Sequence, residues 1–337
     1  MKKHANIPIF IPHYGCPNAC VFCNQVRITG KPSFTEENVR AEIESALKTL
    51  GTDITDVEIA FFGGSFTAIP RSEMLTLLSI SDEYLKSGRI NSVRLSTRPD
   101  AISDEILEIL KAHGVGTIEL GIQSTAHDVL TVCKRGHTAE HSMNACKLIK
   151  KYGFKLIGQM MVGLPNSTPE DELKTAQDII SFGADGARIY PTVVLEGTEL
   201  SRMQKSGCYT ALTVENATER SAKVLDVFSQ NGVQVIRIGL CANEILENEA
   251  SHDSYHAAIG ELVRARVFRN RMEKLLNLAN ETEGKTAVFT IPKGKISQAL
   301  GQKRSNADHL KKIFRLNQIK TVECDSLNDF DVRLTVE

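Results

Sequence analysis

Short apolar runs rich in β-branched residues alternate with longer amphipathic stretches along the first two thirds of the chain. Each run is apolar at consecutive positions, which is the pattern of a parallel strand buried on both faces. A run recurs about every 30 residues, enough for a helical crossover between neighbouring strands. The pattern predicts six parallel strands at residues 7–11, 57–62, 92–96, 117–121, 154–161 and 186–190.

The spacing of these strands fits either a doubly wound sheet or a barrel, and chain length helps to decide. A complete barrel of eight strand-helix units needs roughly 250 residues. The sixth predicted strand already ends at residue 190. We therefore expect an α/β fold in which residues 1–205 form a partial (β/α)6 TIM-like barrel.

The pattern changes after residue 205. Residues 206–284 hold two long helical stretches, 214–230 and 255–279, around an apolar run at 233–240. We expect this helical extension to close the open side of the barrel. Residues 285–337 form a third domain of different composition, because nine Lys or Arg stand against the single Asp308 between Lys285 and Lys320, an excess of eight positive charges.

Composition and charge narrow the class of protein. The chain has 40 Lys plus Arg against 41 Asp plus Glu, so its net charge of −1 excludes an overall basic nucleic-acid coat. No apolar run approaches the roughly 20 residues that span a bilayer, and the first ten residues turn polar too early for a signal peptide. We expect a cytoplasmic protein without a membrane partner. Eight cysteines in 337 residues are too sparse for a disulfide-stapled scaffold.

Three of the cysteines are clustered directly after the first predicted strand. Cys16, Cys20 and Cys23 have the spacing C-x3-C-x2-C, and loops after barrel strands are where barrel enzymes build their sites. A structural zinc site needs a fourth ligand, for which His13 and His4 are the nearest candidates. An iron–sulfur cluster held by three cysteines instead leaves one iron open, which suits a reactive site. We favour the cluster over zinc and over three unliganded thiols.

This motif resembles that of the radical S-adenosylmethionine enzymes. The resemblance implies a 4Fe-4S cluster on the three cysteines and S-adenosyl-L-methionine as second cofactor, cleaved by one-electron reduction to a 5'-deoxyadenosyl radical. It also implies a low-potential electron donor as a partner. Phe22 matches the aromatic residue that commonly precedes the last ligand, and Gly63 and Gly64 match the segment that holds the methionine amino group. A plain glycine turn is the other interpretation of that segment.

Further segments are similar to the radical domain of the Elongator catalytic-subunit family and, more distantly, to oxygen-independent coproporphyrinogen III oxidases. The resemblance covers roughly residues 5 to 240 and implies that Gly64, Gln123, Arg135 and Gln159 line the S-adenosylmethionine site. Both families usually have a glutamate where this chain has Ser96, which becomes the cofactor-binding candidate at that position. The resemblance does not extend to the acetyltransferase domain that follows the radical domain in the Elongator subunit, so we do not expect an acetyl-derived group as the moiety transferred. Tyr190 either faces the reaction chamber, as a weak catalytic candidate, or packs at the barrel rim.

The basic tail has the order strand, helix, turn, helix and strand. This order is similar to a type II KH domain, whose G-x-x-G loop clamps a nucleic-acid backbone. Gly301 begins the corresponding turn, Arg304 stands at its second glycine, and Lys303, Lys311 and Lys312 add positive charge for phosphates. A solvated basic helix pair that caps the barrel is the alternative.

Together these observations predict a radical S-adenosylmethionine enzyme that modifies RNA, such as a tRNA base. One alternative is a small-molecule oxidoreductase of the coproporphyrinogen oxidase type. The other is a non-catalytic iron–sulfur protein that binds RNA. The sequence indicates neither the group transferred nor the oligomeric state.

Overall fold

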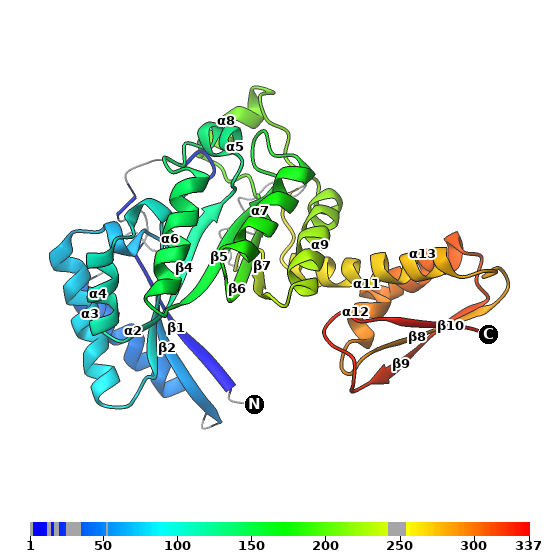
Figure 1. The fold of residues 1–337 in the computed structure, drawn as a ribbon, viewed down its shortest axis with the longest axis horizontal. Helices are drawn as coiled ribbons and strands as arrows, with labels where there is room; N and C mark the ends of the chain where they lie inside the picture. The colour runs from blue at the N-terminus through cyan, green and yellow to red at the C-terminus, as the bar shows by residue number, and fades with distance from the viewer. Residues whose placement is uncertain (1–2, 12–14, 17–19, 25–34, 52, 242–253) are drawn as a thin grey trace.

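The computed structural model describes residues 3–11, 15–16, 20–24, 35–51, 53–241 and 254–337. Its main feature is a curled parallel sheet whose seven strands follow chain order, with helices over its outer face (Figure 1). The partial barrel is therefore confirmed. Its strands are β1 (Lys3–Phe10), β2 (Ile54–Phe62), β3 (Ser92–Thr97), β4 (Val115–Gln123), β5 (Lys155–Val162), β6 (Gly186–Pro191) and β7 (Gln234–Ile238).

The first six strands lie where the apolar runs predicted them, and β7 extends the sheet by one strand. Sequence analysis placed this run in the segment covering the open side, but β7 pairs in parallel with β6, with Arg188 opposite Arg237. It is a short edge strand with an exposed Ile236. Its burial is mixed, because an edge strand is covered less than a central one.

Helices cover the outer face of the sheet in the order expected for right-handed crossovers. One of these helices begins at Pro169, and Thr168 caps it through a reciprocal capping box with Asp171. The helices around the half-barrel are α2 (Glu36–Thr49), α3 (Arg71–Lys86), α4 (Asp104–Ala112), α5 (His127–Val132), α6 (Ala139–Lys151), α7 (Pro169–Ser181), α8 (Glu199–Lys205) and α9 (Val214–Gln230).

The two faces of the sheet differ in chemistry. Side chains alternate between faces along each strand, and in β4 Ile118 and Leu120 join the fully buried apolar core. Between them Glu119 contacts charged side chains from β3 and β6. The outer face is thus an ordinary hydrophobic core under the helices, while the inner face of the half-barrel is polar.

The C-terminal unit lies beyond α9 and is joined to the half-barrel by the long helix α11 (Ile259–Leu278) (Figure 1). Its three-stranded sheet has the order β10-β8-β9, with β8 and β9 parallel and β10 antiparallel. The predicted order of strand, helix, turn, helix and strand is present, and β10 is an addition that sequence analysis missed. The elements are β8 (Thr286–Pro292), α12 (Ile296–Leu300), α13 (Ser305–Ile313), β9 (Gln318–Cys324) and β10 (Arg333–Val336).

The unit is anchored on α11 by one buried amide and one aromatic pair. Asn306 donates from Nδ2 to the carbonyl oxygen of Ala265 in α11 at 2.8 Å. The rings of Phe268 and Phe330 pack with centroids 5.2 Å apart.

Among the helices of the described ranges, none combines the length and the apolar character needed to cross a bilayer. The division into three domains stays a prediction.

Candidate functional site

The polar and glycine-rich segments found in the sequence follow the carboxyl ends of β1 to β5, which meet at one edge of the parallel sheet. We call residues 15–24, which include the three cysteines, the cysteine segment. Gly15 in this segment shows how closely the loops pack. A Cβ atom at Gly15 would lie 2.4 Å from the carbonyl oxygen of Ser65, and its φ of +71° suits glycine. The cysteine segment therefore rests directly on the loop that contains Gly63 and Gly64, both half-buried.

Hydroxyl groups join the loop after β2 to the end of β3. Thr97 shares hydrogen bonds with Ser65 at 3.0 Å and with Thr67 at 2.6 Å, and all three side chains are buried. The backbone amide of Arg98 also donates to the Ser65 hydroxyl at 3.2 Å. These bonds hold the glycine pair in place relative to the third strand.

The three cysteines differ in exposure. Cys20 is buried, Cys23 is half-buried and Cys16 is exposed. Arg135 donates from Nη1 to the Cys20 sulfur at 3.1 Å and from Nη2 to the Gly121 carbonyl oxygen at 2.7 Å. Within the described ranges, no group of three or more His, Cys, Asp or Glu side chains is arranged to hold a metal ion.

Backbone hydrogen bonds attach the cysteine segment to two later parts of the chain. The Val21 amide donates to the Cys133 carbonyl oxygen at 3.3 Å, and the Leu200 amide donates to the Val21 carbonyl oxygen at 2.7 Å. Phe22 packs against the small apolar cluster that contains Val21 and Leu200. This packing shields one side of the cysteine segment from water.

Arg98 is the most informative site residue that the sequence analysis did not select. Only 4% of it is exposed, and it donates from Nε and Nη2 to the two carboxylate oxygens of Asp100, at 2.9 and 2.8 Å. Nη2 also donates to the carbonyl oxygen of Arg135 at 2.8 Å. The signal in the sequence was an arginine directly after a strand, within a segment that already attracted attention for Ser96.

Four buried polar atoms at this edge have no hydrogen-bond partner among the described residues. They are Nη1 of Arg98, Oε1 of Gln123, Nε of Arg135 and Nδ1 of His137. Buried polar groups in proteins are nearly always satisfied. Unused donors and acceptors beside a cysteine triad are what an anionic cluster and an amino-acid cofactor require, so these residues fit the two groups.

His137 is held as the neutral imidazole. Its Nε2 donates to the Ile122 carbonyl oxygen at 3.2 Å. Burial, reinforced by the positive charge of Arg135, lowers the pKa of His137 from 6.5 to about 4. A neutral ring leaves Nδ1 as an acceptor, which can receive a hydrogen bond from a bound ligand.

Gln123 is aimed by a local irregularity of β4. The register between β4 and β5 shifts between Gly121 and Gln123, and Gln123 has a φ of +66°. Such bulges redirect a side chain and are common beside active sites. The strand run predicted from sequence stops at residue 121, so the bulge was not foreseen.

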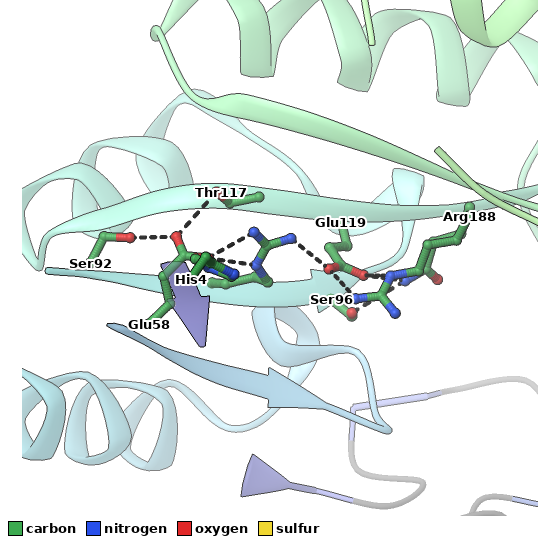
Figure 2. A network of polar contacts seen from close by, with 9 residues as sticks. His4, Glu58, Ser92, Ser96, Thr117, Glu119 and Arg188 are labelled. Atoms are coloured by element: carbon green, nitrogen blue, oxygen red, sulfur yellow. Dashed lines mark hydrogen bonds and ion pairs between the residues drawn. The ribbon is translucent and has the colours of Figure 1, made fainter. Parts of the chain in front are cut away.

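A row of polar and charged side chains crosses the inner face of the sheet (Figure 2). These side chains come from the strands themselves and not from the loops at their carboxyl ends. Arg94 donates to Glu58 at 2.7 Å and to Glu119 at 2.9 Å, and Arg188 donates to Glu119 at 2.8 Å. His4 completes the row, 2.9 Å from Glu58. We call these five residues the polar row. From Glu58 through Arg94 and Glu119 to Arg188 the signs of the charges alternate, so these buried charges are neutralised in place.

Three predicted residues adjoin the polar row. Gln159 donates to Glu119 at 2.9 Å and to the Ser96 hydroxyl at 3.4 Å, so its amide is engaged in the row. Tyr190 lies on the inner face beside Arg188. Burial raises the pKa of the Tyr190 phenol, which the positive charge of Arg188 opposes.

The predicted nucleic-acid residues occupy the C-terminal unit, away from the ends of the barrel strands (Figure 1). Gly301 has φ +76° and ψ 163°, and the next turn carries Lys303 and Arg304 at φ +51° and +63°. Both side chains are exposed, as are Lys311 and Lys312 in the last turn of α13. The four cations thus lie in the same C-terminal unit, and this unit does not contain the cysteine segment.

The sequence of this chain is similar to those of curated proteins of two kinds. The tRNA uridine(34) acetyltransferase of Methanocaldococcus jannaschii is 40% identical over 203 residues, 53% of this chain and 37% of that protein. Elongator complex protein 3 of Schizosaccharomyces pombe is 30% identical over 209 residues, 56% of this chain and 38% of that protein. The chain thus spans less than half the length of these curated relatives.

A solved structure and two family models also match this chain. The archaeal Elp3 of Methanocaldococcus infernus, with an N-terminal deletion, superposes with a TM-score of 0.63 at 25% identity, covering 81% of this chain and 63% of that one. The Radical SAM C-terminal domain model matches residues 184–269. The Radical SAM superfamily model matches residues 10–179, half of the chain. Since that half holds the cysteine triad and most of the parallel strands, this protein belongs to the Radical SAM superfamily.

Proposed function

We propose that this enzyme modifies a base in RNA, in particular tRNA, with Cys16, Cys20 and Cys23 holding the 4Fe-4S cluster that its superfamily uses. The observation that carries the RNA substrate is the 40% identity to a protein named a tRNA uridine(34) acetyltransferase. When bound, the cluster and S-adenosylmethionine supply one-electron reductive cleavage to a 5'-deoxyadenosyl radical.

The residues of the strand-end loops position these groups. Gly63 and Gly64 let the backbone approach S-adenosylmethionine closely, because neither carries a side chain. Arg135 and Gln123 offer a donor and an acceptor that are buried and otherwise unused. The packing of Val21 and Phe22 excludes water from one side of the cysteine segment, which strengthens every polar interaction there.

The C-terminal unit supplies RNA affinity in this proposal. Lys303 and Arg304 are exposed in a tight turn that begins at the buried Gly301, and Lys311 and Lys312 add exposed charge in the last turn of α13. Among the described residues, none of these four cations has an ion-pair partner. Unpaired exposed cations are available for phosphate contacts, whereas cations in ion pairs are not.

The cofactor part is tested by anaerobic reconstitution and detection of 5'-deoxyadenosine after chemical reduction. Wild type is expected to hold about four irons per chain. Cys16→Ala should lose them, because two thiolates cannot hold the cube. Cys208→Ala is the matched control, since Cys208 is also an exposed free thiol but lies outside the triad. Stoichiometric zinc, or equal iron loss in both variants, would contradict the assignment.

The RNA part is tested by comparing modified nucleosides in total tRNA with and without the protein, and by measuring RNA affinity against salt. Lys303→Ala/Arg304→Ala should flatten the plot of log affinity against log salt by about 0.7 for each phosphate that is no longer neutralised. Lys48→Ala/Lys86→Ala removes two exposed charges on α2 and α3 as a control. Production of 5'-deoxyadenosine without RNA binding would favour a small-molecule substrate. RNA binding without 5'-deoxyadenosine would favour a non-catalytic iron–sulfur protein.

A further inference from the structure

The ion pair between Arg98 and Asp100 lies close to the cysteine segment, and the proposed function does not use the charges of this pair. Three loops hold it in place. The Arg98 amide bonds Ser65 from the loop after β2, its guanidinium holds both oxygens of Asp100 from its own loop, and Nη2 bonds the Arg135 carbonyl from the segment after α5. Such a fork allows little movement of the charge.

The pair is close to the cysteine sulfurs. Arg98 bonds the backbone of Arg135, and the side chain of Arg135 bonds the Cys20 sulfur at 3.1 Å. A second path of contacts leads to Cys16, because the preceding residue Gly15 packs on Ser65 and the Ser65 hydroxyl accepts a hydrogen bond from the Arg98 amide. Any charge placed on this segment is therefore in the field of both groups.

The two members are not equivalent. The Arg98 side chain is 5% exposed, whereas that of Asp100 is 26% exposed. Water screens the more exposed charge more strongly. The positive end of the pair therefore acts on the cysteine segment more strongly than the negative end.

We propose that the Arg98–Asp100 pair tunes the reduction potential of the cluster, with Arg98 raising it and Asp100 lowering it. This inference rests on the proposed function, because it requires the cluster to sit on Cys16, Cys20 and Cys23. Reduction adds one electron, taken from a low-potential one-electron donor, and increases the negative charge of the cluster. A nearby fixed positive charge stabilises the reduced form, and a negative charge destabilises it.

The test is a redox titration of the reconstituted full-length protein, followed by electron paramagnetic resonance with dithionite as reductant. Arg98→Gln should shift the equilibrium toward the oxidised cluster by about tenfold, which for one electron is about 59 mV. Asp100→Asn should shift it in the opposite direction by a smaller amount. Arg98→Lys keeps the charge and should restore most of the wild-type potential.

A matched control changes the same charge far from the site. Arg40→Gln breaks the surface pair with Glu83 between α2 and α3, and it should leave the potential unchanged because solvent screens it. A structural role for Arg98 would lower cluster occupancy without giving the two substitutions opposite signs. Shifts of the same sign, or no shift in Asp100→Asn, would overturn the inference.

The outcome also separates this inference from the proposed function. A protein without iron in wild type contradicts the cysteine assignment itself. A complete cluster whose potential ignores both charges contradicts only the tuning. If Arg98→Gln does not retain its cluster, Asp100→Asn and Arg98→Lys still decide the question, since both keep the positive charge.

Discussion

The half-barrel and the C-terminal unit use charge in opposite ways. In the polar row Glu119 is fully buried between Arg94 and Arg188, so each charge has a partner at a fixed distance. In the C-terminal unit, Lys303 and Arg304 are exposed and have no ion-pair partner among the residues described. Buried pairs define position and resist salt, whereas exposed cations attract a polyanion from solution and weaken with salt.

The largest expected effect comes from breaking the polar row. Glu119→Gln leaves two buried guanidinium groups without their shared carboxylate, which should reduce the free energy of unfolding by about 3–5 kcal/mol. Glu83→Gln removes a carboxylate from the exposed Arg40–Glu83 pair and should cost at most about 1 kcal/mol. Urea denaturation of both variants gives the comparison. Equal losses of the free energy of unfolding in the two variants would contradict the view that burial makes the polar row important for stability.

A second prediction concerns acid stability of the strand-end site. Because folding lowers the pKa of His137 from 6.5 to about 4, the unfolded chain binds more protons between these values. Stability therefore declines as the pH falls from 6.5 towards 4, by roughly 3 kcal/mol from this group. His137→Asn should have a shallower decline than wild type in urea denaturation across this window. Parallel declines would show that His137 is not buried as a neutral ring.

A third prediction tests the backbone of the basic turn. Alanine at Gly301 would place its Cβ 2.7 Å from the Ser305 hydroxyl and 2.9 Å from the Asn306 amide, at a φ of +76°. We expect Gly301→Ala to cost about 1–3 kcal/mol, seen as faster hydrogen exchange in α12 and α13, while iron content stays unchanged. Gly294→Ala, at φ +77° with no atom within 4 Å, is the control for backbone strain alone.

The smallest expected effect separates charge from conformation in the same turn. Arg304 has a φ of +63°, which glycine adopts more easily than arginine. Arg304→Gly should therefore change stability by no more than about 1 kcal/mol, in the stabilising direction. It should still weaken RNA binding. The slope of log affinity against log salt should become shallower by about 0.7, the contribution of one neutralised phosphate. Tighter RNA binding by this variant would show that loop geometry outweighs the charge.

Much of the fold could be predicted because the relevant information is local. The apolar runs located six strands, since a parallel strand buried on both faces needs consecutive apolar residues. The apolar run of the edge strand β7 was also recognised, but its pairing with β6, which brings Arg237 opposite Arg188, is a long-range contact that the run itself does not indicate. In the site, the cysteine spacing indicated the correct loop, whereas the position of Arg98 directly after a strand did not reveal its contact with the carbonyl oxygen of Arg135.

Three features of this protein depend on residues that are close together along the chain. They are the order of the strands, the cysteine triad and the excess positive charge of the C-terminal unit. The contacts that organise the site are not. Arg135 reaches Cys20 across 115 positions, and Arg188 reaches Glu119 across 69. Such pairs depend on the register of neighbouring strands and on how far the sheet curls, since a shift of one residue would turn each side chain to the opposite face. Only the tertiary structure decides them.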